Sequence, residues 1–366
     1  MGSTPLVIGG AGFIGSALVR HLAQMGSVRV LDDLSTGRAE NIDGISGVDF
    51  IKGSLLDEDV ARTALQGVST VFHLACLGVR HSIHDPIANH QVNAFGTLKL
   101  LEAARDLGIP RFVYVSTSEV YGTAETVPQS EDHPTWPHTV YGGAKLAGEA
   151  YTRAYHRTYG LPTVVVRPFN AYGPRSHHEG DSGEVIPKFI LRTKNGLPPI
   201  VFGDGQQTRD FTFVDDTARG IAAAGQNADA VGETINLGSG REITVLALAD
   251  VVTAAAGRPD LKPELHPARP GDVLRLMADS RKAADRLGWQ PEVSLADGID
   301  RLLAWHESRG VDWAAALDED ISYNWKPAGA GGSQQEPAQP AEAELPAQPA
   351  EAELPAQPAE DTRYTS

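Results

Sequence analysis

The sequence predicts an α/β protein in which a doubly wound parallel sheet is followed by a smaller C-terminal α/β domain. Short apolar segments alternate with segments of helical length through the first 170 residues, and this alternation is typical of βαβ units. A glycine-rich turn directly follows the first apolar segment. After residue 170 the alternation becomes less regular, and Pro and Gly become more frequent, which indicates a second domain.

The first half of the chain contains segments expected to form strands and segments expected to form helices. The strands are expected at residues 5–9, 28–31, 70–74, 111–116 and 163–167, and the helices at residues 16–24, 92–106 and 141–159. Gly108 and Gly160 follow the last two helices, as glycine commonly follows a helix C-terminus. We therefore expect a sheet domain at residues 1–170, rejoined by about residues 211–240, and a second domain at residues 171–326.

Residues 327–366 differ in composition from the rest of the chain. They consist mainly of Pro, Ala, Gly, Gln and Glu, and a nine-residue repeat begins at Pro337 and again at Pro346. A segment of this kind buries too little apolar surface to offset the entropy that it loses on ordering. We expect it to be a disordered tail.

Composition and charge narrow the classes of function. The 366 residues carry a formal net charge of −16, which disfavours binding to a nucleic-acid backbone. Cys76 is the one cysteine, so no internal disulfide can form, and no apolar run is long enough for a membrane span. His177 and His178 are adjacent and lack the spacing of paired metal ligands. The sequence thus predicts a cytoplasmic protein with no metal site and no nucleic-acid or membrane partner.

The glycine-rich turn has the spacing and the surroundings of a dinucleotide site. Gly9, Gly12 and Gly15 lie between the first strand and the first helix, where glycine lets a pyrophosphate approach the helix N-terminus. Asp32 follows the second strand and can accept hydrogen bonds from the hydroxyls of an adenosine ribose. Because its carboxylate would repel a 2′-phosphate, we expect NAD rather than NADP, bound to a Rossmann-type sheet.

Two further motifs indicate acid–base chemistry beside this cofactor. Tyr141 and Lys145 are four residues apart on an expected helix and share a face, so we expect the Lys145 ammonium to lower the pKa of the Tyr141 hydroxyl. Thr117, Ser118 and Glu119 follow the fourth expected strand, at the sheet edge where doubly wound sheets bind ligands. Their hydroxyls either contact a substrate or cap a helix.

Taken in order along the chain, these motifs resemble those of the extended short-chain dehydrogenase/reductase family, the NAD-dependent nucleotide-sugar epimerases and dehydratases. The resemblance covers about residues 4–310 and includes later segments at residues 167–170, 172–175, 203–205, 208–211 and 269–272. It implies that the cofactor contacts Gly9, Gly12, Phe13, Ile14, Gly15, Asp32, Ser54, Leu55, Ala75, Tyr141 and Lys145. It implies that the nucleotide diphosphate of the substrate and its ribose contact Asn170, Arg209, Arg269 and Asp272, with Lys188 as a further candidate.

The resemblance also implies a homodimer, and two departures from the family's usual pattern concern cofactor contacts. The expected helices at residues 92–106 and 141–159 would form a four-helix interface between two subunits. Ser54 stands where the family often has an aspartate near the adenine, so it offers a hydroxyl contact at most. The loop at residues 76–80 is one residue shorter than the commonest pattern.

The reactions of this family share a first step, and Glu119 discriminates among them. The resemblance implies that Tyr141 deprotonates the sugar 4-hydroxyl while a hydride passes from C4 to NAD⁺. A carboxylate at position 119 can then take the C5 proton, which favours 4,6-dehydration. Residues 116–124 most resemble 4,6-dehydratases acting on nucleotide-linked N-acetylglucosamine, whereas glucose-type enzymes usually have aspartate at the position of Ser118. A nucleotide-sugar 4-epimerase, a UDP-glucuronate decarboxylase and a non-catalytic NAD-binding scaffold stay open as alternatives.

Overall fold

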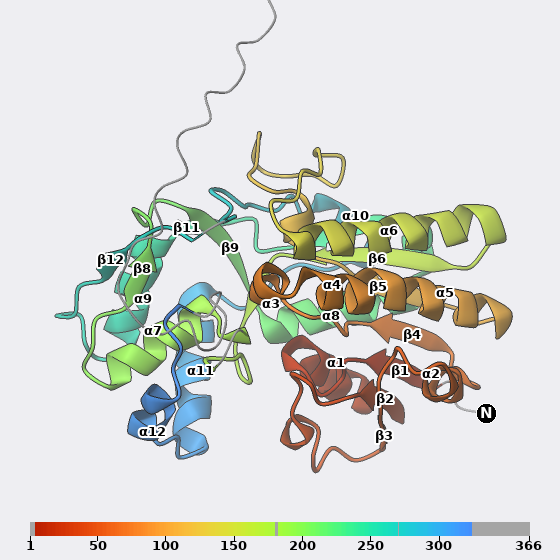
Figure 1. Cartoon of the computed structure of the whole chain (residues 1–366), viewed down its shortest axis with the longest axis horizontal. Helices are drawn as coiled ribbons and strands as arrows, with labels where there is room; N and C mark the ends of the chain where they lie inside the picture. The colour runs from red at the N-terminus through yellow and green to blue at the C-terminus, as the bar shows by residue number, and fades with distance from the viewer. Residues whose placement is uncertain (1–3, 180–181, 270, 324–366) are drawn as a thin grey trace, which may run out of the picture. The chain divides into compact units, whose positions relative to one another are not determined.

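A seven-stranded sheet forms the larger part of the computed structural model, which describes residues 4–323 except 180, 181 and 270 (Figure 1). The expected tail at residues 327–366 lies outside the described residues. The strand order is β3-β2-β1-β4-β5-β6-β10, and every neighbouring pair is parallel. The bounds are β1 Pro5–Ile8, β2 Val28–Asp32, β3 Val48–Lys52, β4 Thr70–His73, β5 Phe112–Val115, β6 Thr163–Pro168 and β10 Thr234–Leu237. The predicted doubly wound parallel sheet is confirmed.

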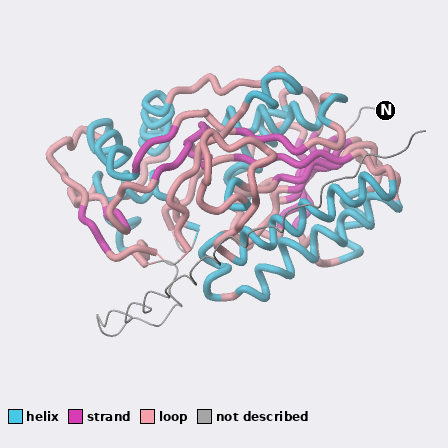
Figure 2. Tube along the Cα trace, turned by 90° about the horizontal axis from the view of Figure 1, so that it is seen from above, coloured by secondary structure: helices cyan, strands magenta, loops and turns pink. Residues whose placement is uncertain are grey.

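Helices cover both faces of this sheet (Figure 2). On one face lie α1 (Phe13–Ala23) and α8 (Val214–Gln226), and on the other lie α2 (Glu58–Leu65), α5 (Gly96–Asp106) and α6 (Val140–Tyr159). Successive strand residues point to opposite faces. Val7 accordingly packs in the core beneath α1 and α8, whereas Leu6 and Ile8 pack in the core beneath α2 and α5.

The second half of the chain builds smaller sheets around a third apolar core. A three-stranded sheet has the order β11-β9-β7, and β12 pairs with β8. The bounds are β7 Asn170–Tyr172, α7 Val185–Lys194, β8 Ile200–Phe202, β9 Thr208–Phe213, β11 Glu242–Thr244, α9 Val245–Ala255, β12 Glu264–His266, α10 Arg281–Leu287, α11 Leu295–Ser308 and α12 Trp313–Asp318. Between β9 and β11 the chain returns to the large sheet and contributes α8 and β10.

The prediction of a single α-helix at residues 92–106 is wrong for its first turn. The structure has two short helices, α3 (Val79–His84) and α4 (Pro86–His90), then a π-helical turn at Gln91–Phe95, and α5 starts at Gly96. The extra residue of a π-helical turn changes where its side chains point. Asn93 in this turn accepts a hydrogen bond from the Leu77 amide at 2.9 Å and donates one to the Leu77 carbonyl at 2.9 Å. It thereby fixes the loop that follows β4.

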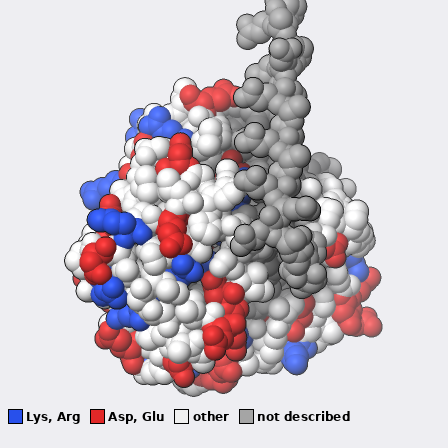
Figure 3. Space-filling model, turned by 60° about the vertical axis from the view of Figure 1, so that its left-hand side comes forward, with Lys and Arg blue, Asp and Glu red and all other residues white. Residues whose placement is uncertain are grey.

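The surface charge and the helix lengths concern the predicted absence of nucleic-acid and membrane partners. On the face seen in Figure 3, acidic and basic side chains of the described residues are interspersed. No helix in the described part of the chain is both long enough and apolar enough to cross a membrane.

Candidate active site

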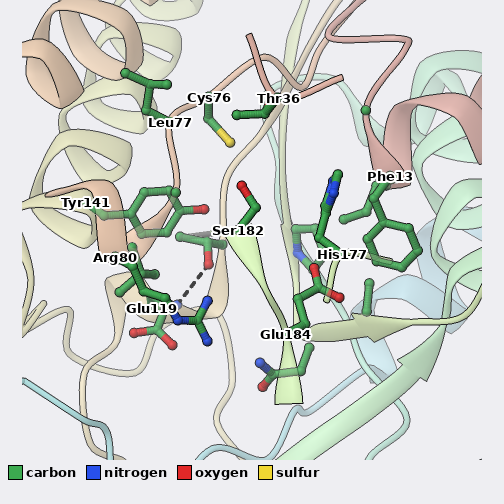
Figure 4. A pocket seen from close by; sticks show the side chains of 18 of the residues that line it. Phe13, Thr36, Cys76, Leu77, Arg80, Glu119, Tyr141, His177, Ser182 and Glu184 are labelled. Atoms are coloured by element: carbon green, nitrogen blue, oxygen red, sulfur yellow. Dashed lines mark hydrogen bonds between the residues drawn. The ribbon is translucent and has the colours of Figure 1, made fainter. Parts of the chain in front are cut away.

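A cavity of about 650 Å³ lies where the parallel strands of the large sheet end. Its walls include the residues directly after β1, β2, β4, β5 and β6 and side chains from β7, α7 and β9 (Figure 4). In parallel α/β sheets, ligands bind at the carboxyl ends of the strands. The cavity is bordered by all of the predicted site residues: Gly9, Gly12, Phe13, Ile14, Gly15, Asp32, Ser54, Leu55, Ala75, Thr117, Ser118, Glu119, Tyr141, Lys145, Asn170, Lys188, Arg209, Arg269 and Asp272.

The turn between β1 and α1 is shaped by contacts that exclude side chains. Gly9 has a φ of +85°, and a Cβ there would lie 2.6 Å from the amide nitrogen of Ala75. A Cβ on Gly15 would lie 2.0 Å from the carbonyl oxygen of Gly9. Gly12 is the N-cap of α1 and provides no side-chain cap. The first amides of α1 therefore stay available to an anion, as a pyrophosphate requires.

Asp32 ends β2 with its carboxylate held by backbone amides. It accepts hydrogen bonds from Ala11 at 2.9 Å and from Leu34 at 2.8 Å, and burial raises its pKa. A carboxylate can accept about four hydrogen bonds, so lone pairs remain for the hydroxyls of a ribose. The hydroxyl oxygen of Ser54 accepts a hydrogen bond from the nearby Leu56 amide at 3.2 Å. Leu55 is buried against α2 and α5, so this pair contributes shape more than polarity.

A 3₁₀ turn places Thr117 and Glu119 at the cavity, and the capped N-terminus of α6 places Tyr141 there. Residues 118–120 form a 3₁₀ turn, in which Thr117 Oγ1 accepts a hydrogen bond from the Glu119 amide at 3.2 Å. Thr139 caps α6 by accepting from the Gly142 amide at 3.1 Å, which sets Tyr141 in the first helical turn. The capping interpretation of the Ser/Thr motif is therefore confirmed for Thr117, which also borders the cavity; a contact of its hydroxyl with a substrate stays a prediction.

The expected effect of Lys145 on Tyr141 is not observed. Burial raises the pKa of Tyr141 well above its ordinary value, and a hydrogen bond with Thr117 opposes this rise without cancelling it. The Lys145 ammonium donates a hydrogen bond to the Val115 carbonyl at 2.6 Å and lies 4.4 Å from the centre of the Tyr114 ring. Burial lowers the pKa of Lys145 as well. Helical spacing predicted the shared face but not the burial that dominates both groups.

Glu119 interacts electrostatically with three arginines that border the cavity. Burial raises its pKa, while the charges of Arg209, Arg269 and Arg80 act to lower it. Arg209 is 7% exposed and donates to Asp272 at 2.6 Å, and Arg269 donates to the other oxygen of Asp272 at 3.2 Å. Asp272 thus joins two guanidinium groups from distant segments into one basic surface, which suits a diphosphate.

Asn170 and Lys188 differ in whether other residues of the protein form hydrogen bonds with their polar atoms. Asn170 begins β7, and its Oδ1 is buried without a hydrogen-bond partner among the described residues. Lys188 donates to Asp320 at 2.6 Å and to the Ile321 carbonyl at 2.8 Å. The ammonium of Lys188 is therefore already engaged, although the side chain borders the cavity.

Arg80 and Glu184 are among the charged residues of the cavity that sequence reasoning missed. Arg80 lies on α3 beside Glu119 and Tyr141, and Glu184 lies beside His177 on the facing wall (Figure 4). Arg80 is the last residue of the shortened loop after β4, and that departure in length was the available signal. Nothing in the spacing around Glu184 distinguished it from a surface carboxylate.

Comparison with known proteins is consistent with this geometry. The family model described as GDP-mannose 4,6 dehydratase matches residues 6–302. A UDP-glucose 4-epimerase of Mycolicibacterium smegmatis is 40% identical over 311 residues, covering 83% of this chain and 98% of that protein. A dTDP-glucose 4,6-dehydratase of an Actinoplanes species is 35% identical over 323 residues, covering 84% of this chain and 99% of that protein.

Solved structures agree with the sequence comparisons. An epimerase of Methanothermobacter thermautotrophicus has a TM-score of 0.81 at 37% identity, covering 87% of this chain and 95% of that one. A dTDP-glucose 4,6-dehydratase of Streptomyces venezuelae, solved with NAD and TYD bound, has a TM-score of 0.79 at 34% identity, covering 84% of this chain and 98% of that one. The cofactor predicted from the glycine turn and Asp32 is the one present in that structure. This chain therefore belongs to the GDP-mannose 4,6 dehydratase family, within the extended short-chain dehydrogenase/reductases that act as NAD-dependent nucleotide-sugar epimerases and dehydratases.

Proposed function

We propose that this enzyme is a nucleotide-sugar 4,6-dehydratase, which converts an NDP-hexose into its 4-keto-6-deoxy derivative. The observation that carries the proposal is that Glu119 borders the same cavity as Tyr141 and Thr117. Because burial raises the pKa of Glu119, its carboxylate is a stronger base than an exposed one. An epimerase has no use for a base at this position, whereas a dehydratase must remove the C5 proton.

Each residue then has a defined task. Bound NAD⁺ supplies the hydride acceptor and a positive charge near the substrate. The phenolate form of Tyr141, which the positive charge of bound NAD⁺ would favour against the burial of this side chain, takes the proton of the sugar 4-hydroxyl, which the Thr117 hydroxyl helps to position. Glu119 takes the C5 proton, which the neighbouring 4-ketone makes acidic, and the C6 hydroxyl leaves as water. The hydride held by the cofactor would then return to C6 while a solvent-derived proton returns to C5, which gives the 4-keto-6-deoxy sugar. Arg209 and Arg269 hold the diphosphate.

The 4-epimerase is the second candidate, and the relatives supply the observation in its favour. Two curated relatives, 40% and 36% identical, carry the names UDP-glucose 4-epimerase and putative UDP-glucose 4-epimerase. In that reaction the 4-keto sugar turns over within the cavity and takes the hydride back on its other face. Glu119 would then be a carboxylate without a chemical step.

We also propose that the enzyme acts as a homodimer. Ile87 on α4 is 71% exposed, Phe95 in the π-helical turn 46% and Tyr159 on α6 54%. Figure 1 shows α4 and α5 following one another in one helical row on one face of the large sheet, with α6 beside this row. Large apolar side chains exposed along adjoining helices are typical of an interface. Sedimentation of the wild type and of Ile87→Lys tests this, with a shift of the variant to monomer as the expected result.

The reaction is tested by product analysis in deuterated water. Purified enzyme is incubated with UDP-N-acetylglucosamine, UDP-glucose, UDP-glucuronate, GDP-mannose and dTDP-glucose, and the products are read by mass and NMR. We expect loss of one water and deuterium at C5 from one of them, and loss of both signals in Glu119→Gln. Glu125→Gln, an exposed carboxylate of the same segment, serves as control. Inversion at C4 without a mass change would mean an epimerase, and loss of CO₂ from UDP-glucuronate a decarboxylase.

A further inference from the structure

The cavity contains a second carboxyl group that the proposed steps leave unused. Glu184 precedes α7 as its N-cap residue, yet its side chain makes no capping hydrogen bond. Its Oε2 atom is buried and has no hydrogen-bond partner among the described residues. Its side chain borders the cavity on the wall opposite Tyr141 and Glu119 (Figure 4). A buried carboxyl oxygen without a partner costs stability, so a structural role does not explain it.

The surroundings of Glu184 favour the protonated form of its carboxyl, which a general acid needs. Burial raises its pKa to about 7; the charges of His177 and Arg80 act against this rise, and the charge of Glu179 adds to it. Arg80 interacts electrostatically with both Glu119 and Glu184, and its Nε atom is buried without a partner in the described part of the chain. The two carboxyls thus meet different surroundings across one cavity, which is how a site separates an acid from a base.

The proposed dehydration needs an acid that the segment at residues 117–119 does not supply. Glu119 is committed as the base, and the hydroxyls of Thr117 and Ser118 are far weaker acids than a carboxyl. A C6 hydroxyl leaves as water when a proton reaches its oxygen, and a positioned acid accelerates such a step by about 10²–10⁴-fold.

We propose that Glu184 is the general acid that protonates the leaving C6 hydroxyl of the sugar. This inference rests on the proposed 4,6-dehydration. The C5–H bond breaks and its proton passes to Glu119, while its electron pair forms the C5=C6 double bond. The C6–O bond breaks and the oxygen takes its electron pair and the Glu184 proton, leaving as water. Glu184 is left as a carboxylate beside Arg80 and His177, whose charges stabilise it.

The test separates proton removal from loss of the leaving group. Glu184→Gln is compared with the wild type, with Glu119→Gln and with Glu179→Gln, in which the neighbouring carboxylate that pairs with Arg38 is removed. We expect Glu184→Gln to lose water from the substrate about 10²–10⁴-fold more slowly. It should still place deuterium at C5 of recovered substrate, since Glu119 is intact, whereas Glu119→Gln should lose exchange and elimination together.

A substrate whose leaving group needs no proton provides the rescue. With the 6-deoxy-6-fluoro analogue, Glu184→Gln should release fluoride at close to the wild-type rate, read by fluorine NMR. Wild-type loss of water in Glu184→Gln, or an equal loss of rate with both substrates, would overturn the acid role while leaving the dehydratase proposal intact. A wild type that inverts C4 without losing water would reject the dehydratase proposal and this inference with it.

Discussion

The two walls of the cavity are held in place by different means. The first wall is formed by residues before position 160, and contacts with the backbone hold its site residues in place. Gly15 packs on the Gly9 carbonyl, Asp32 accepts hydrogen bonds from two backbone amides, and Lys145 donates a hydrogen bond to a backbone carbonyl. The second wall is formed by residues after position 160, and ion pairs between side chains hold it, such as those of Arg209 and Arg269 with Asp272. Backbone contacts fix atoms more tightly than ion pairs between long side chains.

This difference matches what each wall has to recognise. The first wall has most of its polar groups already paired, which suits a partner that never changes, such as the cofactor. Buried polar atoms without partners in the described structure lie on both walls: Arg80 Nε on the first, and Asn170 Oδ1 and Glu184 Oε2, both oxygens, on the second. Such atoms reject ligands that cannot satisfy them, so they are where specificity for a substrate can arise.

The contrast is tested most strongly at Gly15. Gly15→Ala places a Cβ 2.0 Å from the Gly9 carbonyl oxygen, a clash between backbone atoms that no rotamer relieves. We expect a loss of about 3 kcal/mol in the free energy of unfolding, the upper part of the range for overpacking, together with loss of bound cofactor. Chemical denaturation and release of nucleotide from the purified protein measure the two effects.

Gly12→Ala is the matched control for this prediction. A Cβ at Gly12 would approach the Gly9 carbonyl no closer than 3.4 Å, and its φ of −74° suits any residue. The free energy of unfolding should therefore stay within about 1 kcal/mol of wild type. If Gly15→Ala were as stable as Gly12→Ala, the first wall would not depend on its backbone contacts.

The second wall is tested at Arg209. Arg209→Met removes a nearly buried guanidinium that pairs with Asp272, and it should weaken binding of a nucleoside diphosphate by about 1.5–3 kcal/mol, the value of a hydrogen bond to a charged group. Arg209 is also the first of the charges that lower the pKa of Glu119, so that pKa should rise. Calorimetry with UDP and the pH dependence of C5 exchange measure the two effects.

An exposed arginine near the same strands provides the control for Arg209. Arg241→Met should leave both binding and the pH dependence unchanged. Equal weakening in the two variants would mean that net charge, rather than the pair with Asp272, attracts the diphosphate. The claim that ion pairs between side chains organise the second wall would then be wrong.

The same contrast explains how much of the molecule could be predicted from the sequence. Gly9, Gly15 and Asp32 were identifiable because a strand, a tight turn and a helix place them at fixed spacings. Arg80 and Glu184 were not, because loops whose paths no local pattern specifies bring them to the cavity. The π-helical turn at Gln91–Phe95 was missed because an apolar helical period does not reveal one extra residue.

The role of Lys145 shows the same limit in electrostatics. The i,i+4 spacing correctly placed Lys145 and Tyr141 on one helix at one cavity. The direction of the Tyr141 pKa shift was wrong because burial, which depends on how the whole sheet packs above the helix, outweighs the charge of a neighbour. Distances along the chain predict proximity better than they predict solvation.

The smallest expected effect concerns stability at Glu184. Its pKa is raised from 4.5 to about 7 in the folded protein, so the folded state binds this proton more tightly than the unfolded chain does. Above pH 7 the carboxyl is ionised in both states and its burial costs stability; this cost falls as the pH drops from 7 to 4.5 and is absent below that. Glu184→Gln should therefore be more stable than wild type at pH 8 and equal to it at pH 4.

Glu179 offers a control of opposite sign for this measurement. Burial acts to raise its pKa, but the hydrogen bond with His177 and the charge of Arg38 outweigh burial and lower it. Glu179→Gln should therefore be less stable than wild type from pH 8 down to about pH 4.5, since the stabilisation is lost only as the pH falls below the unfolded pKa of 4.5. Denaturation midpoints measured from pH 4 to pH 8 for the three proteins test both signs. If the two variants shifted in the same direction, the carboxyls would share one environment, and Glu184 would not be set apart as an acid by the wall that it lies on.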